Sequence, residues 1–210
     1  AFDESRSMTL FDYYGNELFK GERFELISPI GGGYFYIVKG INPDYPFTKG
    51  KKIEIVNKDR SKVITIQDRN NRLFDPLVYF MNYKEKDYFL FRNDDNISLF
   101  NRKGKLVFQK EFSNIIGSIK MFQGHICVND NKEYKLYDLK GTSIKTKDYK
   151  QIIGRKELYF AIGKLKDGSE ELIDLKNYST ELLPFSVDVI LKNKFALVEQ
   201  NNLMGIIQFN

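Results

Sequence analysis

The sequence contains few of several residue types: its 210 residues include no tryptophan and only five prolines. Cysteine and histidine, which often act as nucleophiles or metal ligands, occur once each. The single cysteine, Cys127, excludes an internal disulfide and a cysteine-rich zinc site. No run of about 18 apolar residues occurs, so no membrane span is expected. The first residues, AFDESRSM, lack the apolar core of a signal peptide.

The composition favours strands over helices. Phenylalanine and tyrosine are abundant, at 18 and 13 residues, and aromatic residues make up 15% of the chain. Aromatic and β-branched residues suit the pleated surface of a sheet. The hydrophobic content of 42% is ordinary for a globular protein, and no low-complexity segment suggests disorder. We therefore predict an all-β chain, with residues 1–210 forming a single β-repeat domain.

A short phrase recurs along the chain. In its clearest form, two apolar residues precede Asn101, and Gly104 follows three positions later. The same spacing returns at Asp12–Gly15 and Asp138–Gly141. Asp or Asn caps the first position of a type I turn, and glycine accepts positive φ at its end. Each copy predicts a strand, a tight turn and a second strand. Weaker copies read IEIVNKDR from Ile53, ELIDLKNY from Glu171, and GIIQFN at the end of the sequence.

Two further phrases keep a fixed order with the first. An aromatic or apolar residue stands three positions before an isoleucine in Phe24–Ile27, Phe112–Ile115, Tyr149–Ile152 and Val187–Ile190. A strand of alternating apolar residues then closes each unit. Successive turn positions are separated by 36 to 45 residues. This period predicts a repeat architecture of about five units, each with three to four antiparallel strands, arranged like the blades of a propeller.

The first two units are longer, and we expect their extra residues to form loops. One is Gly40–Lys51, which contains the aromatic residues Tyr45 and Phe47, and the other lies within Arg69–Asp87. Insertions in repeat proteins gather on one face, which is often the binding face. Tyr45 and Phe47 are therefore candidate ligand-binding residues, although loops also vary without a role in binding.

The net charge of +5 is concentrated in one segment. Lys140–Lys156 contains six basic residues and one acid, Asp148. Lys145, Lys147 and Lys150 are candidate ligands for a polyanion. Tyr149 occupies a core position of the repeat, which argues against its stacking on nucleic acid. Lysines on strand faces and turns also protect sheet edges without binding anything.

Other constellations have structural interpretations. His125 and Cys127 share one face of a predicted strand, but neighbours on one strand are too far apart for a nucleophile and its base. Gly31–Gly33 precedes a strand rather than a helix, which predicts a turn or bulge rather than a phosphate loop. Glu170 and Glu171 read as a solvated pair after a turn. We therefore predict no catalytic, metal-binding or cofactor-binding residues and no cofactor.

The repeat resembles that of the WG-repeat family of bacterial proteins, which reads roughly Trp-Gly-Leu-Ile-Asp-Lys-Lys-Gly. The best matches are Tyr134–Gly141 (YKLYDLKG) and Glu170–Asn177 (EELIDLKN). Met204 takes the Trp position before Gly205, the one place where the naming glycine is kept. The resemblance identifies a divergent member without tryptophan. It implies a β-repeat domain, often in extracytoplasmic (periplasmic or cell-surface) or interaction roles, and no known catalytic site.

These features predict a non-catalytic binding or scaffold module whose ligand is a protein or a glycan. A first alternative is a carbohydrate-active hydrolase on a propeller-like scaffold, because a fold can bring two distant carboxylates together. A second alternative is a polyanion-binding module that uses the basic segment, with nucleic acid disfavoured as the polyanion.

Overall fold

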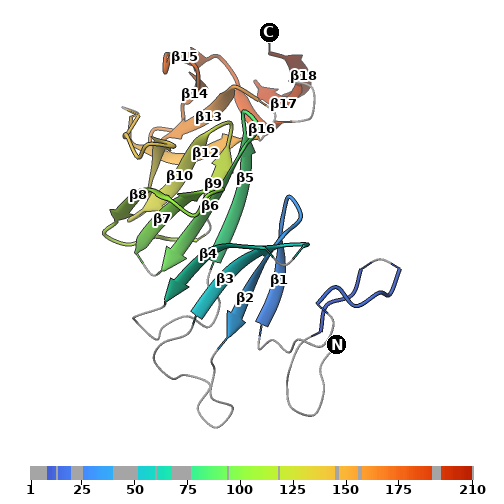
Figure 1. Cartoon of the computed structure of the whole chain (residues 1–210). Coiled ribbons are helices and arrows are strands. Elements are labelled where there is room, and N and C mark those ends of the chain that lie inside the picture. Colours follow the sequence, from blue (N-terminus) through green and yellow to red (C-terminus); the bar gives the residue numbers. More distant parts are fainter. Residues whose placement is uncertain are drawn as a thin grey trace. The chain divides into compact units, whose positions relative to one another are not determined.

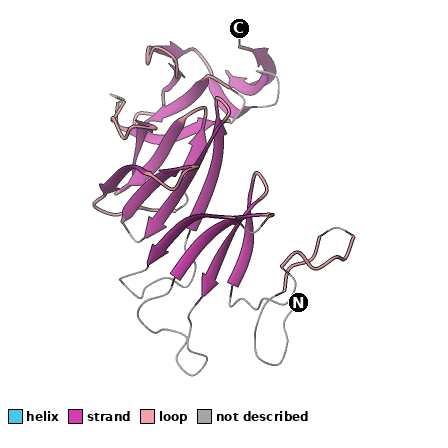
Figure 2. Cartoon of the chain, in the orientation of Figure 1, coloured by secondary structure: helices cyan, strands magenta, loops and turns pink. Residues whose placement is uncertain are grey.

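The computed structural model describes residues 9–12, 14–19, 26–39, 52–59, 61–67, 77–93, 95–117, 119–144, 147–155, 158–190 and 195–209. The regular elements of these residues are all β-strands (Figure 2). None of the described residues forms a helix that is long and apolar enough to cross a membrane. Tyr45, Phe47 and Lys145 lie outside the described residues, so their predicted roles stay predictions.

The chain divides into two compact units, residues 1–109 and 110–210, which are described separately. The strands of the first unit are β1 (Leu26–Gly31), β2 (Tyr34–Lys39), β3 (Lys52–Asn57), β4 (Lys62–Gln67), β5 (Leu77–Tyr83), β6 (Lys86–Asn93), β7 (Asn96–Asn101) and β8 (Leu106–Glu111), which ends just inside the second unit. The strands of the second unit are β9 (Lys120–Phe122), β10 (His125–Asp130), β11 (Glu133–Asp138), β12 (Tyr149–Gly154), β13 (Phe160–Leu165), β14 (Glu170–Asp174), β15 (Thr180–Leu183), β16 (Ser186–Ile190), β17 (Phe195–Gln200) and β18 (Leu203–Gln208).

Within each sheet, strands that lie side by side are also neighbours in the sequence (Figure 1). Strands β1–β4 form sheet 1 and β5–β8 form sheet 2. Strands β9–β15 form one seven-stranded sheet, but β11 and β12 share a single residue pair, Tyr134 with Tyr149. We therefore treat β9–β11 as sheet 3 and β12–β15 as sheet 4, and β16–β18 form sheet 5. The predicted all-β architecture of about five units with three to four antiparallel strands is confirmed.

The turn after the third strand has the predicted chemistry. The side-chain Oδ1 of Asn101 accepts hydrogen bonds from the backbone N–H groups of Lys103 (2.9 Å) and Lys105 (3.1 Å). Gly104 follows with φ of +73°. The Asp12 and Asp138 turns repeat this arrangement, with φ of +85° and +81° at their glycines. Glycine is required here because the left-handed region is costly for other residues.

Apolar side chains fill the space between consecutive sheets. In the first unit, Tyr36 and Ile55 of sheet 1 belong to one buried cluster with Phe89 and Phe91 of sheet 2. The opposite face of sheet 1 is covered by residues 10–19, because Leu10, Leu18 and Phe19 pack with its Ile27, Ile37 and Val56. In the second unit, one cluster joins sheets 3 and 4, and another joins sheets 4 and 5. A sheet therefore needs a neighbour on each side to bury both faces.

The prediction of a loop within residues 69–87 is wrong for residues 77–87, the part of this range that the structure describes. Residues 77–83 form β5, and only the Lys84–Glu85 turn separates that strand from β6. Val78 and Phe80 of β5 pack against the core of sheets 1 and 2. The length of the repeat suggested an insertion, but the alternation of large side chains was the better guide. Residues 69–76 lie outside the described residues.

Gly31–Gly33 forms the predicted turn between β1 and β2. All three glycines have positive φ, of +106°, +61° and +77°. A Cβ added at Gly32 would lie 2.3 Å from the ring of Phe80, so strand β5 of sheet 2 approaches the turn closely only because glycine stands there. The segment is a packing feature of the fold.

Cys127 is expected to be inert while the second unit is folded. The side chain is 1% exposed, and burial raises the pKa of its thiol to about 12. Because the thiolate is the reactive form, an alkylating reagent such as iodoacetamide should modify Cys127 only after unfolding. Mass spectrometry after timed alkylation, with and without urea, measures this. Rapid modification of the native protein would contradict the expectation.

Candidate functional site at the charged end of sheets 3 and 4

One end of sheets 3 and 4 gathers charged side chains. Tyr149, the first residue of β12, pairs with Tyr134 near the start of β11 and with Leu165 at the end of β13. The β10–β11 turn, the β13–β14 turn and the start of β12 therefore lie at the same end. We call this region the charged end, and it consists of Asp130, Glu133, Lys135, Lys147, Asp148, Lys164, Lys166, Glu170 and Glu171.

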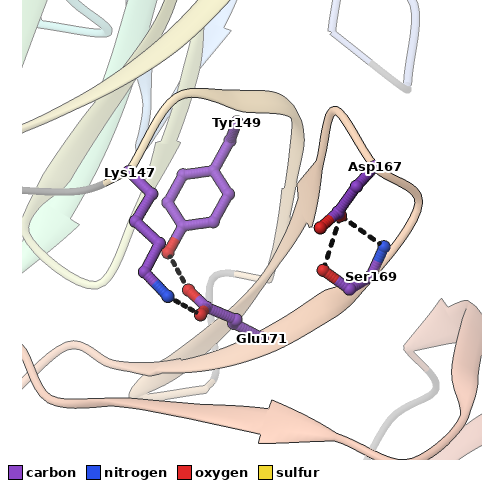
Figure 3. Close-up of polar contacts among 5 residues, drawn as sticks. All are labelled: Lys147, Tyr149, Asp167, Ser169 and Glu171. Carbon is purple, nitrogen blue, oxygen red and sulfur yellow. Dashed lines mark hydrogen bonds and ion pairs between the residues drawn. The ribbon is translucent and has the colours of Figure 1, made fainter.

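Glu171 is the centre of the first group of contacts (Figure 3). Its side chain is 3% exposed, yet it accepts a hydrogen bond of 2.8 Å from the hydroxyl of Tyr149 and pairs with the ammonium of Lys147. The ring of Tyr149 lies over Gly163, where an added Cβ would meet it at 2.3 Å. Burial and the Glu171 carboxylate both raise the pKa of Tyr149. Glu171 thus holds the connection before β12 against sheet 4.

Glu170 makes the corresponding contacts on the other face of β14. Its Oε2 accepts a hydrogen bond of 2.8 Å from the backbone N–H of Val187 in sheet 5, and its Oε1 lies 2.9 Å from the ammonium of Lys164. Successive residues of a strand point to opposite faces, so the two carboxylates act on opposite sides of one strand. Strand β14 is thereby tied to the connection before it and to the sheet after it.

The prediction that Glu170 and Glu171 form a solvated pair is wrong. They are 4% and 3% exposed, because sheets 3 and 5 cover both faces of β14. The equivalent position in sheet 1 is also acidic and buried in the structure. Glu54, three residues before the turn residue Asn57 as Glu171 is before Asp174, is also 3% exposed and pairs with Lys62 at 2.7 Å.

Asp130 fixes the connection that leads into sheet 3. Its Oδ1 accepts hydrogen bonds of 3.0 Å from the backbone N–H groups of Ser113 and Asn114, and its Oδ2 lies 2.7 Å from the ammonium of Lys135. Burial alone would raise the pKa of Asp130, but Lys135 and the two N–H groups together hold that pKa below its ordinary value. The carboxylate is therefore a structural anchor in its charged form.

Lys166 joins the two sheets at the surface. Its ammonium lies 2.8 Å from Glu133 of sheet 3 and 3.8 Å from Asp148. Both partners and Lys166 are solvent-accessible, so these contacts contribute little to stability. They do neutralise the surface, because each of the charges at this end stands beside one of opposite sign.

The described part of the basic segment does not form one continuous surface. Lys147 pairs with Glu171, and Lys150 is exposed on β12. Lys140 lies in the turn after β11, at the opposite end of the sheets from Lys147. The guanidinium of Arg155 donates a hydrogen bond to the backbone carbonyl of Ile190. Polyanion binding by Lys147 and Lys150 therefore stays a prediction. The described basic residues of this segment do not lie together on one face.

The buried acidic residues of the charged end stabilise the fold and are not placed as a catalytic pair. A glycoside hydrolase needs two carboxyl groups facing one substrate, about 5 to 10 Å apart. Glu170 and Glu171 face opposite sides of β14, and each is engaged by protein groups. Among the described residues, no three His, Cys, Asp or Glu side chains are grouped closely enough to hold a metal ion.

His125 should make the second unit less stable in mild acid. Burial lowers the pKa of His125 below its ordinary value near 6.5, so the unfolded chain takes up a proton more readily than the folded one. Neutral His125 therefore contributes its full stability above about pH 6.5. This contribution is lost as the pH falls below that value, by at most about 1.4 kcal/mol per pH unit. Urea unfolding of the wild type and of His125→Gln at pH 7.5 and 5.5 measures the difference. An equal loss in both proteins would contradict this assignment.

Comparison with known proteins supports the fold alone. Neither protein families nor curated proteins gave a match. Solved structures with a similar fold are β-propellers. The WD40 domain of SCAP from fission yeast superposes with a TM-score of 0.53 at 17% identity, over 93% of this chain and 54% of that domain. BamB from Moraxella catarrhalis gives 0.49 at 9% identity, over 97% of this chain and 70% of that one. The chain thus spans about half of the SCAP domain, and its sheets are of the propeller class.

Proposed function

We propose that this chain is a non-catalytic scaffold module that binds another protein. The observation that carries the proposal is an apolar surface on sheet 5. The exposed large apolar side chains on the outer face of this sheet form the apolar patch, which consists of Val189, Phe195, Met204 and Ile206. Contiguous exposed apolar surface of this kind marks a site of protein association.

The position of these side chains supports this interpretation. Val189 of β16 pairs with Leu197 of β17, which pairs with Ile206 of β18, so the three residues form one row across the sheet. The opposite face of sheet 5 is buried against sheet 4 through Val187, Ala196 and Val198. The apolar patch is thus the second face of a sheet whose first face is already covered.

The charged end supports the same proposal by contrast. Its buried acids are satisfied by lysines and backbone groups, and its surface charges are balanced. A ligand recognised by charge, such as a polyanion, would have to displace these contacts. The propeller class of the fold and the resemblance to WG repeats are both compatible with an interaction role, and a glycan ligand has no comparable support.

An affinity capture experiment tests the proposal. The immobilised chain is incubated with lysate of the source organism at about 0.1 M and 1 M salt, since high salt screens contacts between exposed charges. We expect specific proteins to be retained at both concentrations, because apolar contacts do not weaken with salt. Variant Val189→Ser/Phe195→Ser should lose them.

The matched control replaces apolar residues of similar exposure in the first unit, as Phe11→Ser/Leu106→Ser. This control should retain the same proteins as the wild type. The proposal is overturned if nothing is retained, if retention disappears at high salt, or if the patch variant captures the same proteins as the control.

A further inference from the structure

The turn between β14 and β15 departs from the pattern of the repeat. In the matching turn after β11, the backbone N–H of Asp138 donates a hydrogen bond to the carbonyl of Thr142. In the turn after β14, the equivalent bond runs from the N–H of Asp174 to the carbonyl of Ser179. The second of these bonds closes a turn that is longer by one residue.

The extra residue is Asn177. Up to Lys176 the two turns match, because the N–H groups of Lys176 and Lys140 each donate to the side chain of the Asp that opens the turn. After the extra residue they match again, since the N–H of Tyr178 donates to the carbonyl of that Asp, as the N–H of Gly141 does in the shorter turn. Asn177 therefore lies between two positions that the repeat keeps.

The longer turn also has a tyrosine where the repeat has glycine. Tyr178 adopts a φ of +63°, a left-handed conformation that is costly for residues other than glycine. Its ring packs edge-on against His125, with the ring centroids 5.8 Å apart. The turns at Gly104 and Gly141 close with glycine and without an extra residue. Closure of the turn therefore does not account for Asn177.

The extra residue creates the sequence Asn177-Tyr178-Ser179, which is an acceptor motif for an N-linked sugar. All three residues are exposed. The side-chain Oδ1 of Asn177 accepts a hydrogen bond of 2.8 Å from the backbone N–H of Ser179. Among the residues that the structure describes, Nδ2 of Asn177 donates no hydrogen bond. A sugar on Nδ2 therefore leaves the hydrogen bonds of the turn intact.

The sequence contains one other motif of this kind, Asn96-Ile97-Ser98, and the fold makes it inaccessible. These residues belong to β7, which lies between β6 and β8 in sheet 2. Asn96 and Ser98 are half-buried, and Ile97 between them is fully buried. A transferase has to reach the Asn amide and the Ser hydroxyl together, because the motif is recognised through both. Asn96 thus provides a comparison within the same chain.

From these observations we propose that Asn177 accepts an N-linked sugar on the folded protein and that Asn96 does not. In the reaction, Nδ2 of Asn177 forms a bond to C1 of the sugar and loses one proton. The bond between C1 and a phosphate oxygen of the donor breaks, and the phosphate leaves with the electron pair, so no oxidant or reductant is needed. The donor is a nucleotide-linked or lipid-linked sugar phosphate, and a transferase of the source cell takes up the proton. This chain supplies the acceptor alone, and the modification is independent of the apolar patch on sheet 5.

Mass spectrometry of the full chain isolated from the source organism tests the proposal. Peptides that contain Asn177 and Asn96 are fragmented by electron transfer, which leaves a sugar attached to its side chain. We expect added saccharide mass at Asn177 and none at Asn96. A single saccharide unit indicates a nucleotide-linked donor, and a preassembled oligosaccharide indicates a lipid-linked donor, and either result supports the proposal.

Variants of the motif make the test specific. Ser179→Ala removes the hydroxyl but keeps the hydrogen bond to Asn177, because that bond uses the backbone N–H. This variant should lose the sugar completely, whereas Ser179→Thr should keep it. Ser169→Ala is the matched control, because Ser169 lies in the β13–β14 turn and outside both motifs, and it should keep the sugar. Circular dichroism verifies that each variant folds as the wild type does.

The proposal is overturned if Asn177 has no sugar in the wild type, or if folded Ser179→Ala retains it. It is also overturned if Asn96 is modified to the same extent, because the sugar would then be added before the chain folds and the structure would not select the site. None of these results depends on the capture of proteins by sheet 5, so the scaffold function is tested separately.

Discussion

Gly163→Ala is expected to destabilise the second unit by about 3 kcal/mol, at the upper end of the range for overpacking a core. The added Cβ would lie 2.3 Å from one ring carbon of Tyr149 and 2.6 Å from the next, both far inside contact distance. Tyr149 is fully buried, and its hydroxyl is fixed by Glu171, so the ring cannot move away without losing that hydrogen bond. The backbone at Gly163 does not require glycine, which makes the effect purely steric. Urea unfolding followed by far-UV circular dichroism measures it.

Gly205→Ala is the matched control, because Gly205 also lies within a strand and its added Cβ would meet only Val198, at 3.9 Å. We expect a change within about 0.5 kcal/mol, of either sign. Combining Gly163→Ala with Tyr149→Leu should cost less than the sum of the two single changes, since the smaller side chain leaves room for the methyl group. If the double variant loses as much stability as the two single variants together, the ring of Tyr149 is not the obstacle.

Glu171→Ala is expected to cost about 3 kcal/mol, because it leaves a buried phenol without its acceptor and removes one partner of an ion pair. Lys147→Ala should cost less than about 1 kcal/mol, since Lys147 is 61% exposed and water replaces its lost contact. The asymmetry between the two halves of one ion pair is the informative result. It follows from the burial of the acid rather than from the distance between the charges.

The control for Glu171→Ala is Asp167→Ala, at the same end of sheet 4 (Figure 3). Asp167 is exposed and accepts hydrogen bonds from Ser169 within its own turn, so little change in the urea midpoint is expected. A double-mutant cycle of Glu171→Ala with Tyr149→Phe isolates the hydrogen bond between them, and we expect a coupling of about 1.5 to 3 kcal/mol. Equal costs for Glu171→Ala and Lys147→Ala would contradict the structural role of the acid.

Local signals in the sequence were sufficient to predict the repeat. The spacing from Asn101 to Gly104 predicted a type I turn with a left-handed glycine, because both requirements depend on adjacent residues only. The core position assigned to Tyr149 was confirmed for the same reason, since the repeat placed an aromatic side chain there in several copies. The alternation of large apolar side chains around Val78 and Phe80 is typical of a strand as well. The length of the repeat unit predicted a loop there instead.

Features that depend on contacts between sheets were not predictable from the sequence. Whether Glu170 is solvated depends on sheet 5 covering one face of β14, and a hydrogen bond from Val187 decides it. Gly163 gives no sign in the sequence that a distant ring lies over it. The exposure of Ile206 is equally invisible, because β18 is as apolar as the buried third strands, and only the structure shows that Ile206 lies on the face of sheet 5 away from sheet 4.

Within each sheet of the described residues, every strand pairs only with strands next to it in the sequence, and this has a consequence for biosynthesis. Because no sheet waits for a partner from a distant part of the chain, a sheet can close soon after its last strand leaves the ribosome. Within each unit, a new sheet then finds the face of its predecessor already formed, as sheet 2 does with sheet 1, and sheets 4 and 5 do with sheets 3 and 4. Each unit is therefore suited to fold from its first residues onward, and during its synthesis the outer face of its newest sheet is the one still open to water.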